Sequence, residues 1–417
     1  MSFSETLMEG NPRLKRTLTL PYVVLYGLGV TVGAGIYVLI GEVIGRAGDF
    51  APLAFLISGI VMLFPAAAFA ELTGRMPYAA AEAHFVGVGF NSRVLFLLVG
   101  LAVAAIGIVS SAAIAHGAAG YISELVAIDR PFLLTLIILG TGFVACLGIR
   151  SSILFAGLLT LIEVGGLLLI VIGAFGGGGD FAGQAIKSVP VTFSPAVWAG
   201  IAGSSLLAFF AFIGFEDIDS IAEETVNPQR TLAWGIFLTL GISVAIYMLV
   251  VLAALVAVPA EEIAGQSAPL ALVFSRTTGL TPTTITLIAI LATVNGIIVQ
   301  IIMAGRVLYG LANRGTLPGI LAKVSTITHT PVIATVLSVV IVLALALTFP
   351  ITELAEWTSI ITLSVFILVC ASLIRIKASG EPAPPGTFII PVWVPYCGVV
   401  ACAALLIFGA FAGASGH

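Results

Sequence analysis

The chain has 417 residues, of which 60% are hydrophobic and only 9% are charged, and its formal net charge is −4. An ordinary soluble domain carries about a quarter charged residues, so this composition predicts an all-α polytopic membrane protein. The cationic residues are spread singly and form no basic patch, which argues against a nucleic-acid partner.

Eleven apolar segments are long enough to cross a bilayer, whose hydrocarbon core of about 30 Å takes about 20 helical residues. They are Leu20–Ile44, Pro52–Leu72, Val94–Ile122, Phe132–Gly148, Ile153–Phe175, Val197–Ile221, Leu232–Val258, Thr284–Leu311, Val332–Phe349, Trp357–Ile374 and Val392–Phe411. The first has no A-x-A cleavage site, so we do not expect it to be a removed signal peptide.

The distribution of Lys and Arg predicts the orientation, because cytoplasmic loops retain these residues. With the N-terminus inside, the outer segments hold only Arg46, Arg130, Lys187 and Arg276 of the sixteen cationic residues. We therefore expect a cytoplasmic N-terminal segment at residues 1–19. We also expect a multi-pass protein of the cell (plasma) membrane.

Glycines interrupt the first apolar segment at Gly27, Gly29, Gly33 and Gly35. A backbone group without a partner costs several kcal/mol in lipid, so these glycines indicate unwound chain lining a polar cavity, where a substrate could bind. The alternative is close helix packing, since Gly29-x-x-x-Gly33 is also a small-xxx-small pattern.

The sixth segment carries a second interruption, in which Gly214 is followed by Glu216, Asp217 and Asp219. A carboxylate at the centre of a membrane helix costs about 2.5–3.5 kcal/mol, so we expect Glu216 to face protein or water. The alternative is that the helix simply ends here, with the carboxylates at the cytoplasmic surface.

Interruptions in the first and sixth segments are what two inverted five-helix repeats predict, because five spans reverse the orientation of the second repeat. The repeats would cover residues 20–175 and 197–374, and an additional transmembrane helix would follow at 388–411. No linker is long enough to hold a soluble domain. The sequence therefore predicts a single membrane domain.

Broken helices in such a repeat suit a zwitterionic substrate. The half-helix that begins near Gly35 presents free N–H groups and the positive end of its dipole to a carboxylate. Carbonyl groups freed around Thr31, Val32, Phe212 and Ile213 can accept hydrogen bonds from an ammonium group. This polarity indicates an amino acid.

Several motifs resemble, in the same order, those of the amino acid–polyamine–organocation (APC) transporter superfamily, which has the LeuT-type fold. They are Gly33-Ala34-Gly35-Ile36-Tyr37, Ala70-Glu71-Leu72 with Arg75-Met76-Pro77 and Glu82, Phe209-Phe210-Ala211-Phe212 with Gly214-Phe215-Glu216, Asn227-Pro228, and Arg306-Val307-Leu308 with Ala312 to Pro318. The likeness extends over most of the chain. Tyr37 stands where the family has Phe, and Ala80, Ala81 and His84 replace glycines and a tyrosine.

The resemblance implies a central site formed by the two broken helices, with side chains from the third, eighth and tenth. Ile106 and Ser110 are candidates on the third helix. The substrate-binding residues carried over by position are Thr31, Val32, Gly33, Ala34, Gly35, Ile36, Phe209, Phe212, Ile213, Gly214 and Phe215. Phe209, Phe212 and Phe215 either form an aromatic gate or pack as ordinary core residues.

A lysine of the fifth helix replaces a sodium ion in some proton-coupled members, and the matching position here is Glu163. Glu163 is twelve residues past Ser151, which at about 1.5 Å per helical residue places it about 18 Å deep, near the middle of the bilayer. Three roles remain open for it. Glu163 exchanges the coupling proton, or it helps to bind Na⁺ with the carbonyls of Gly29 and Val32 and with Thr293, or it stays protonated and hydrogen-bonds a neighbouring helix. Acidic residues inside the membrane are functional by default, so we expect Glu163 to take part in coupling, with H⁺ preferred to Na⁺ as the coupling ion. Glu216 is a further candidate for ion coupling.

We therefore expect a secondary active amino acid permease that works by alternating access, as a proton-coupled symporter without a cofactor. The alternatives are an ion-independent exchanger of amino acids or polyamines and an amino acid sensor that does not transport. The partners are the small-molecule substrate and the lipid bilayer. The sequence shows no Ser/His/Asp or Cys/His arrangement with a plausible soluble cleft, so we do not expect an enzyme. The cysteines lack the spacing of metal ligands, so we do not expect a metal site.

Overall fold

The computed structural model describes residues 16–76, 81–148, 153–191, 194–380 and 382–415. Regular structure in these ranges is helical, apart from one isolated bridge between Leu18 and Thr225. The prediction of an all-α chain is confirmed. Most of the predicted cytoplasmic N-terminal segment, residues 1–15, lies outside the described residues.

Each of the eleven predicted segments is largely helical. The long elements are α1 (Leu20–Thr31), α2 (Ala34–Ala47), α3 (Ala51–Arg75), α5 (Arg93–Ser123), α6 (Arg130–Leu147), α7 (Ile153–Gly176), α9 (Pro195–Phe210), the 3₁₀-helix η3 (Phe215–Glu224), α10 (Pro228–Ala257), α13 (Thr283–Asn313), α14 (Val332–Thr348), α15 (Ile351–Ala378) and α16 (Trp393–Ser415). The short elements are α4 (Ala81–Phe90), α8 (Phe181–Lys187), α11 (Ala260–Ile263), α12 (Pro269–Thr278) and the 3₁₀-turns η2 (Gly48–Phe50) and η4 (Gly319–Ala322).

The helices are those of a polytopic membrane protein. Within the described residues, 8 helical stretches are long and apolar enough to cross a membrane, and α1, α14 and α16 are shorter apolar helices. The predicted tenth segment was too short, because α15 already begins at Ile351. Glu353 lies in its first turn, where a carboxylate interacts favourably with the positive end of the helix dipole.

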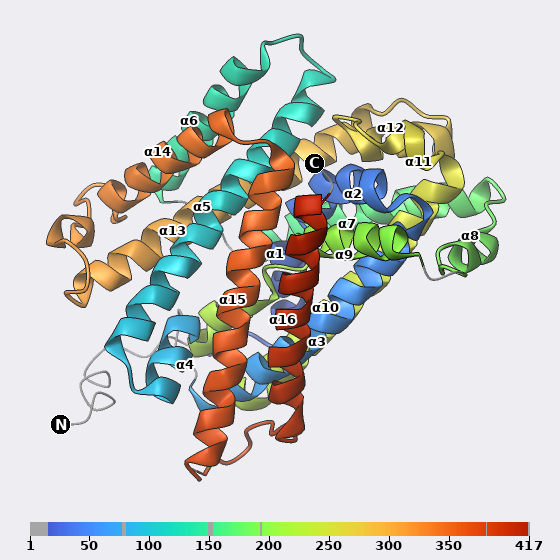
Figure 1. Cartoon of the computed structure of the whole chain (residues 1–417). Helices are drawn as coiled ribbons and strands as arrows, with labels where there is room; N and C mark the ends of the chain where they lie inside the picture. The colour runs from blue at the N-terminus through green and yellow to red at the C-terminus, as the bar shows by residue number, and fades with distance from the viewer. Residues whose placement is uncertain (1–15, 77–80, 149–152, 192–193, 381, 416–417) are drawn as a thin grey trace.

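Two groups of helices pack around the interior (Figure 1). The long helices α5 and α13 pack along each other, and α6 and α14 pack beside them. On the other side α3 packs on α10 and α9, and α1 packs on α10. The last two long helices, α15 and α16, pack together, with α15 against α5 and α16 against α9.

The described N-terminal segment is attached to the end of η3. The N–H groups of Thr17 and Leu18 donate to the carbonyl of Glu224 at 2.9 and 3.0 Å, and Val226 N–H donates to the carbonyl of Leu18 at 2.9 Å. The start of α1 and the end of η3 are therefore held together by backbone hydrogen bonds.

Candidate functional site

The first break separates α1 from α2 at Val32 and Gly33. Val32 N–H still donates to the carbonyl of Leu28 at 2.7 Å, after which Gly33 leaves the helical conformation with φ −69° and ψ −127°. No described side chain caps the N-terminus of α2. The N–H groups of the first turn, Ala34 to Ile36, therefore lack intrahelical partners and point toward the break. The predicted interruption is confirmed.

The two glycines before the break serve helix packing. Gly27 and Gly29 lie inside α1. A methyl group in place of the Gly27 hydrogen would lie 2.5 Å from Oγ1 of Thr239 on α10, and one at Gly29 would collide with Oγ1 of Thr160 on α7. The close-packing alternative is therefore correct for these two positions, while unwinding is correct at Gly33.

The second break begins where α9 ends. The N–H groups of Ala211, Phe212 and Ile213 donate to carbonyls three residues earlier at 3.1, 3.0 and 3.2 Å, so the helix tightens before it breaks. Gly214 has a φ of +122°, which side-chain-bearing residues rarely adopt, and its N–H donates to Oε2 of Glu216 at 2.8 Å.

The chain continues from Gly214 as the 3₁₀-helix η3. Glu216 and Asp219 are buried, with relative exposures of 7% and 4%. The α-helix does end here, at Phe210, as the alternative expected, but two of its three carboxylates, Glu216 and Asp219, are not exposed, and only Asp217 is partly exposed. The expectation that Glu216 faces protein is confirmed.

The two breaks are in direct backbone contact. A methyl group in place of the Gly35 hydrogen would lie 2.8 Å from Cα of Ala211, and one at Gly214 would lie 2.9 Å from the carbonyl oxygen of Val30. Only glycine permits this approach. Unpaired N–H groups of α2 and freed carbonyl groups of both breaks thus meet at one place.

Tyr247 of α10 joins the two breaks. Its hydroxyl lies 2.7 Å from the carbonyl oxygen of Thr31 and 2.8 Å from that of Ala211. One hydroxyl hydrogen serves one acceptor at a time, so the two carbonyls compete for it. Sequence reasoning missed this residue, because a tyrosine within an apolar helix carries no signal of its own.

The three predicted gate phenylalanines do not lie together. The rings of Phe209 and Phe215 both contact Phe366 of α15, with centroids 6.2 and 5.8 Å apart. Phe212 lies against Tyr247 and Phe55, with centroids at 5.0 and 6.4 Å. Two of the three residues therefore share a cluster, while the third packs between α3 and α10.

Glu163 approaches the first break from α7. Its side chain is 1% exposed, and among the described residues Oε1 has no hydrogen-bond partner. Oε2 lies 3.7 Å from where a Cβ at Gly33 would be. Its main chain is fixed by Tyr37, whose hydroxyl donates to the carbonyl of Glu163 at 2.7 Å. The hydroxyl of Thr293 donates within α13, to the carbonyl of Ala289 at 2.7 Å.

The third and eighth predicted segments flank the start of α2. A methyl group at Gly296 of α13 would lie 3.1 Å from Cβ of Ala34 and 3.6 Å from Cδ1 of Ile114 on α5. Ile106 and Ser110 lie about two turns and one turn farther along α5 toward its N-terminus. Ile114 of α5 thus lies near the point where α13 meets the start of α2.

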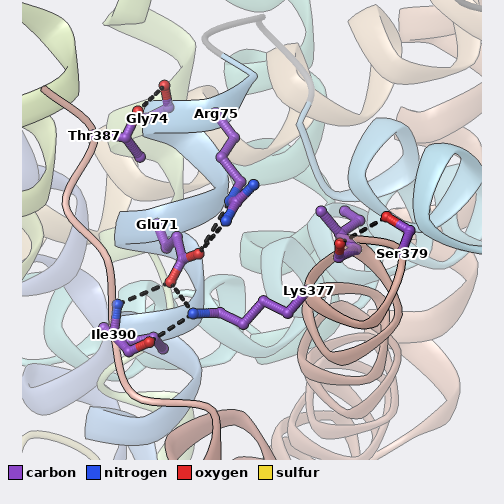
Figure 2. A network of polar contacts seen from close by, with 8 residues as sticks. Glu71, Gly74, Arg75, Lys377, Ser379, Thr387 and Ile390 are labelled. Atoms are coloured by element: carbon purple, nitrogen blue, oxygen red, sulfur yellow. Dashed lines mark hydrogen bonds and ion pairs between the residues drawn. The ribbon is translucent and has the colours of Figure 1, made fainter. Parts of the chain in front are cut away.

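A buried ion network lies apart from the breaks (Figure 2). Glu71 of α3 is 0% exposed, and its carboxylate lies 2.9 Å from Nη2 of Arg75 and 2.7 Å from Nζ of Lys377 on α15. It also accepts the N–H of Ile390 at 2.9 Å. In the sequence Glu71 could be recognised only as part of a motif, since its partners Lys377 and Ile390 are remote in the chain.

Comparisons with known proteins identify amino acid permeases and transporters as similar to this chain. A family model described as amino acid permease matches residues 18–417. The chain is 31% identical to the vacuolar cationic amino acid transporter 2 of Arabidopsis thaliana, over 88% of this chain and 60% of that protein. It is 26% identical to the branched-chain amino acid permease BcaP of Bacillus subtilis, over 92% and 86% of the two chains. The chain thus spans only about 60% of the length of the plant relative.

Proposed function

The chain belongs to the amino acid permease family, and on this basis we propose that it is a secondary active amino acid transporter of the plasma membrane that works by alternating access. The observation that carries the proposal is the contact between the two helix breaks. Relatives are named for cationic and for branched-chain substrates, and both classes are open at this point.

We assign the substrate's two charged groups to the backbone of the breaks. The carboxylate binds the free N–H groups of Ala34 to Ile36, because the N-terminus of α2 carries a partial positive charge. The ammonium group binds the carbonyls of Thr31 and Ala211, which already share the Tyr247 hydroxyl. Both ends of any α-amino acid are thereby recognised without a charged side chain.

We propose that residues 20–175 and 197–374 form an inverted repeat, an arrangement that suits alternating access. When the helices of the two halves are paired in order, the same packing recurs with the halves exchanged. The helix α1 packs on α7 and α10, as α9 packs on α15 and α3. Likewise α6 packs on α13, as α14 packs on α5. We place α16, within the predicted segment 388–411, outside the repeat.

The packing of α1 and α2 supports a conformation closed toward the outside. The outer half-helix α2 packs on α5 and α13, whereas α1 packs on α7, α10 and η3. An ion pair between Nη1 of Arg46 and Oε1 of Glu356, 2.5 Å apart, joins the last turn of α2 to the start of α15. Transport then requires α2 to separate from α5 and α13 while α1 closes on the inner side.

We assign the coupling proton to Glu163. An ionised carboxylate buried without a partner is costly, so the protonated form suits the closed site and release suits the site open to water. The position of Oε2 beside Gly33 allows protonation to affect the first break directly. Sodium is the competing ion, with the carbonyls of Gly29 and Val32 and Thr293 as further ligands. Glu216 is the weaker candidate for ion coupling, because its carboxylate already accepts the N–H of Gly214.

Uptake of radiolabelled amino acids into proteoliposomes tests this proposal. We expect uptake to respond to an inward proton gradient and not to sodium, and we expect Glu163→Gln to abolish that response while exchange of amino acids persists. Unchanged proton-driven uptake by Glu163→Gln would remove Glu163 from the mechanism. Uptake that requires amino acid on the opposite side would indicate an exchanger, and binding without uptake would indicate a sensor.

A further inference from the structure

The first turn of α2 has a different neighbour on each of three sides. Gly33 faces Glu163 of α7, Gly35 faces Ala211 at the second break, and Ala34 faces α13 and α5. The first two sides are occupied by a helix and by the ammonium acceptors. The third side is closed by α5 and α13, from which α2 separates in the proposed transport cycle, so the side chain of an amino acid held at the breaks extends toward these two helices.

The wall on that side carries no charge. Its nearest groups are Ile114, which is 5% exposed, and the backbone of Gly296, which approaches Ala34 so closely that an added methyl group would lie 3.1 Å from its Cβ. Ser110, one turn from Ile114, and Gln300, one turn from Gly296, are buried and uncharged. The helices α5, α9 and α13 contain no Asp or Glu along their whole length. In α15 only Glu353 and Glu356 occur, both in its first two turns, and Glu356 is paired with Arg46.

The remaining buried carboxylates near the breaks do not supply a charge on this wall. Glu163 approaches Gly33 from α7, and Glu216 accepts the N–H of Gly214 within its own segment. A lysine or arginine side chain would thus be buried at membrane depth without a counter-charge. The cost of such a charge corresponds to about 100-fold in affinity.

We infer that the protein transports neutral amino acids and rejects cationic ones, because the wall formed by Ile114 and Gly296 supplies no counter-charge. This inference rests on the proposed function and selects between the two substrate classes named there. The α-carboxylate and α-ammonium groups are recognised by backbone, so the wall is what distinguishes one amino acid from another.

Binding and uptake by the purified protein test the inference. Calorimetric titration and proteoliposome counterflow with leucine, alanine, lysine and arginine should show the neutral pair binding about 100-fold more tightly than the cationic pair. Lysine or arginine binding as tightly as leucine would overturn the inference and leave the proposed function standing. If none of the four binds or is taken up, the proposed function fails, and the inference fails with it.

Variants of the wall provide a second test. Ile114→Glu should gain lysine affinity and lose leucine affinity, whereas Ile114→Gln, which has a similar size and no charge, should keep the preference for neutral substrates. If Ile114→Glu does not fold, Gly296→Ala tests the same wall without a new charge. Its methyl group should raise the KM for leucine several-fold more than the KM for alanine. Equal changes for the two substrates would contradict the assignment of the wall.

Discussion

The substitution Gly35→Ala tests the contact between the two breaks through the sign of its effect. In a helix, alanine is favoured over glycine by about 1 kcal/mol, so the change alone should stabilise α2. The added methyl group, however, would lie 2.8 Å from Cα of Ala211, where ordinary contacts lie at 3.4–4 Å. Because the obstacle is backbone, the second break must move.

Overpacking of this kind costs about 1–3 kcal/mol, which offsets the helix-propensity gain and turns the net effect into a loss of up to about 2 kcal/mol. The shift also displaces the carbonyl of Ala211 relative to α2, and a misplacement of about 1 Å can cost about 100-fold in a positioned site. We therefore expect Gly35→Ala to lower the unfolding midpoint. We also expect it to reduce the kcat/KM of uptake about 10- to 100-fold.

The matched control is Gly140→Ala on α6, where the methyl group meets no atom within 4 Å. It carries the same helix-propensity gain, so its unfolding midpoint should equal or exceed that of the wild type, with unchanged uptake. The measurements are thermal unfolding in detergent and proteoliposome uptake on the same preparations. If Gly35→Ala behaves like Gly140→Ala in both, the breaks are not in contact and the reasoning is refuted.

Further substitutions test the surrounding interactions. Glu71→Gln should lower the free energy of unfolding by about 3–5 kcal/mol, because it removes the buried negative charge that neutralises Lys377 and Arg75. Glu262→Gln, in an exposed pair, should cost at most about 1 kcal/mol, and equal effects of the two substitutions would contradict the burial of the network. Tyr247→Phe should cost about 1–3 kcal/mol, since a buried carbonyl loses its donor; an unchanged midpoint would refute this. Burial and, secondarily, Arg314 lower the pKa of His84, so stability should fall as the pH drops below the ordinary histidine value of 6.5. His84→Gln should flatten this loss of stability when unfolding is measured between about pH 8 and about pH 5. An equal loss in the variant and the wild type would show that His84 is not its cause.

The existence of the two breaks could be predicted from the sequence, because glycines and carboxylates within apolar segments conflict with continuous membrane helix. The extent of the first break could not. Gly29 and Gly33 are the same residue type in the same segment, and only the neighbour differs. Thr160 packs against Gly29 and requires its small size, while Gly33 caps the N-terminus of α2 and faces Oε2 of Glu163.

The aromatic residues show where local periodicity fails. Phe209, Phe212 and Phe215 are spaced three residues apart and would share one face of a continuous α-helix. The chain leaves the α-helix after Phe210 and turns at Gly214, so Phe212 packs in a different aromatic cluster, against Tyr247. Spacing predicts a shared face only while the helix continues.

Partners that are remote in the chain were also beyond prediction. Glu71 accepts a hydrogen bond from the backbone of Ile390, 319 residues away, and a backbone N–H has no sequence signature. The carbonyl groups that meet Tyr247 belong to two different segments. Such contacts depend on how the two halves of the chain pack, which the composition and motifs of each segment do not determine.

Hydrogen–deuterium exchange with and without a saturating neutral amino acid tests most directly whether the broken backbone holds the substrate. The N–H groups of Ala34, Gly35 and Ile36 have no intrahelical partners, so they should exchange rapidly in the free protein. We expect substrate to slow exchange in peptides covering residues 31–36 and 211–216. Unchanged exchange in both peptides under conditions where calorimetry shows the amino acid bound would contradict the assignment of the site.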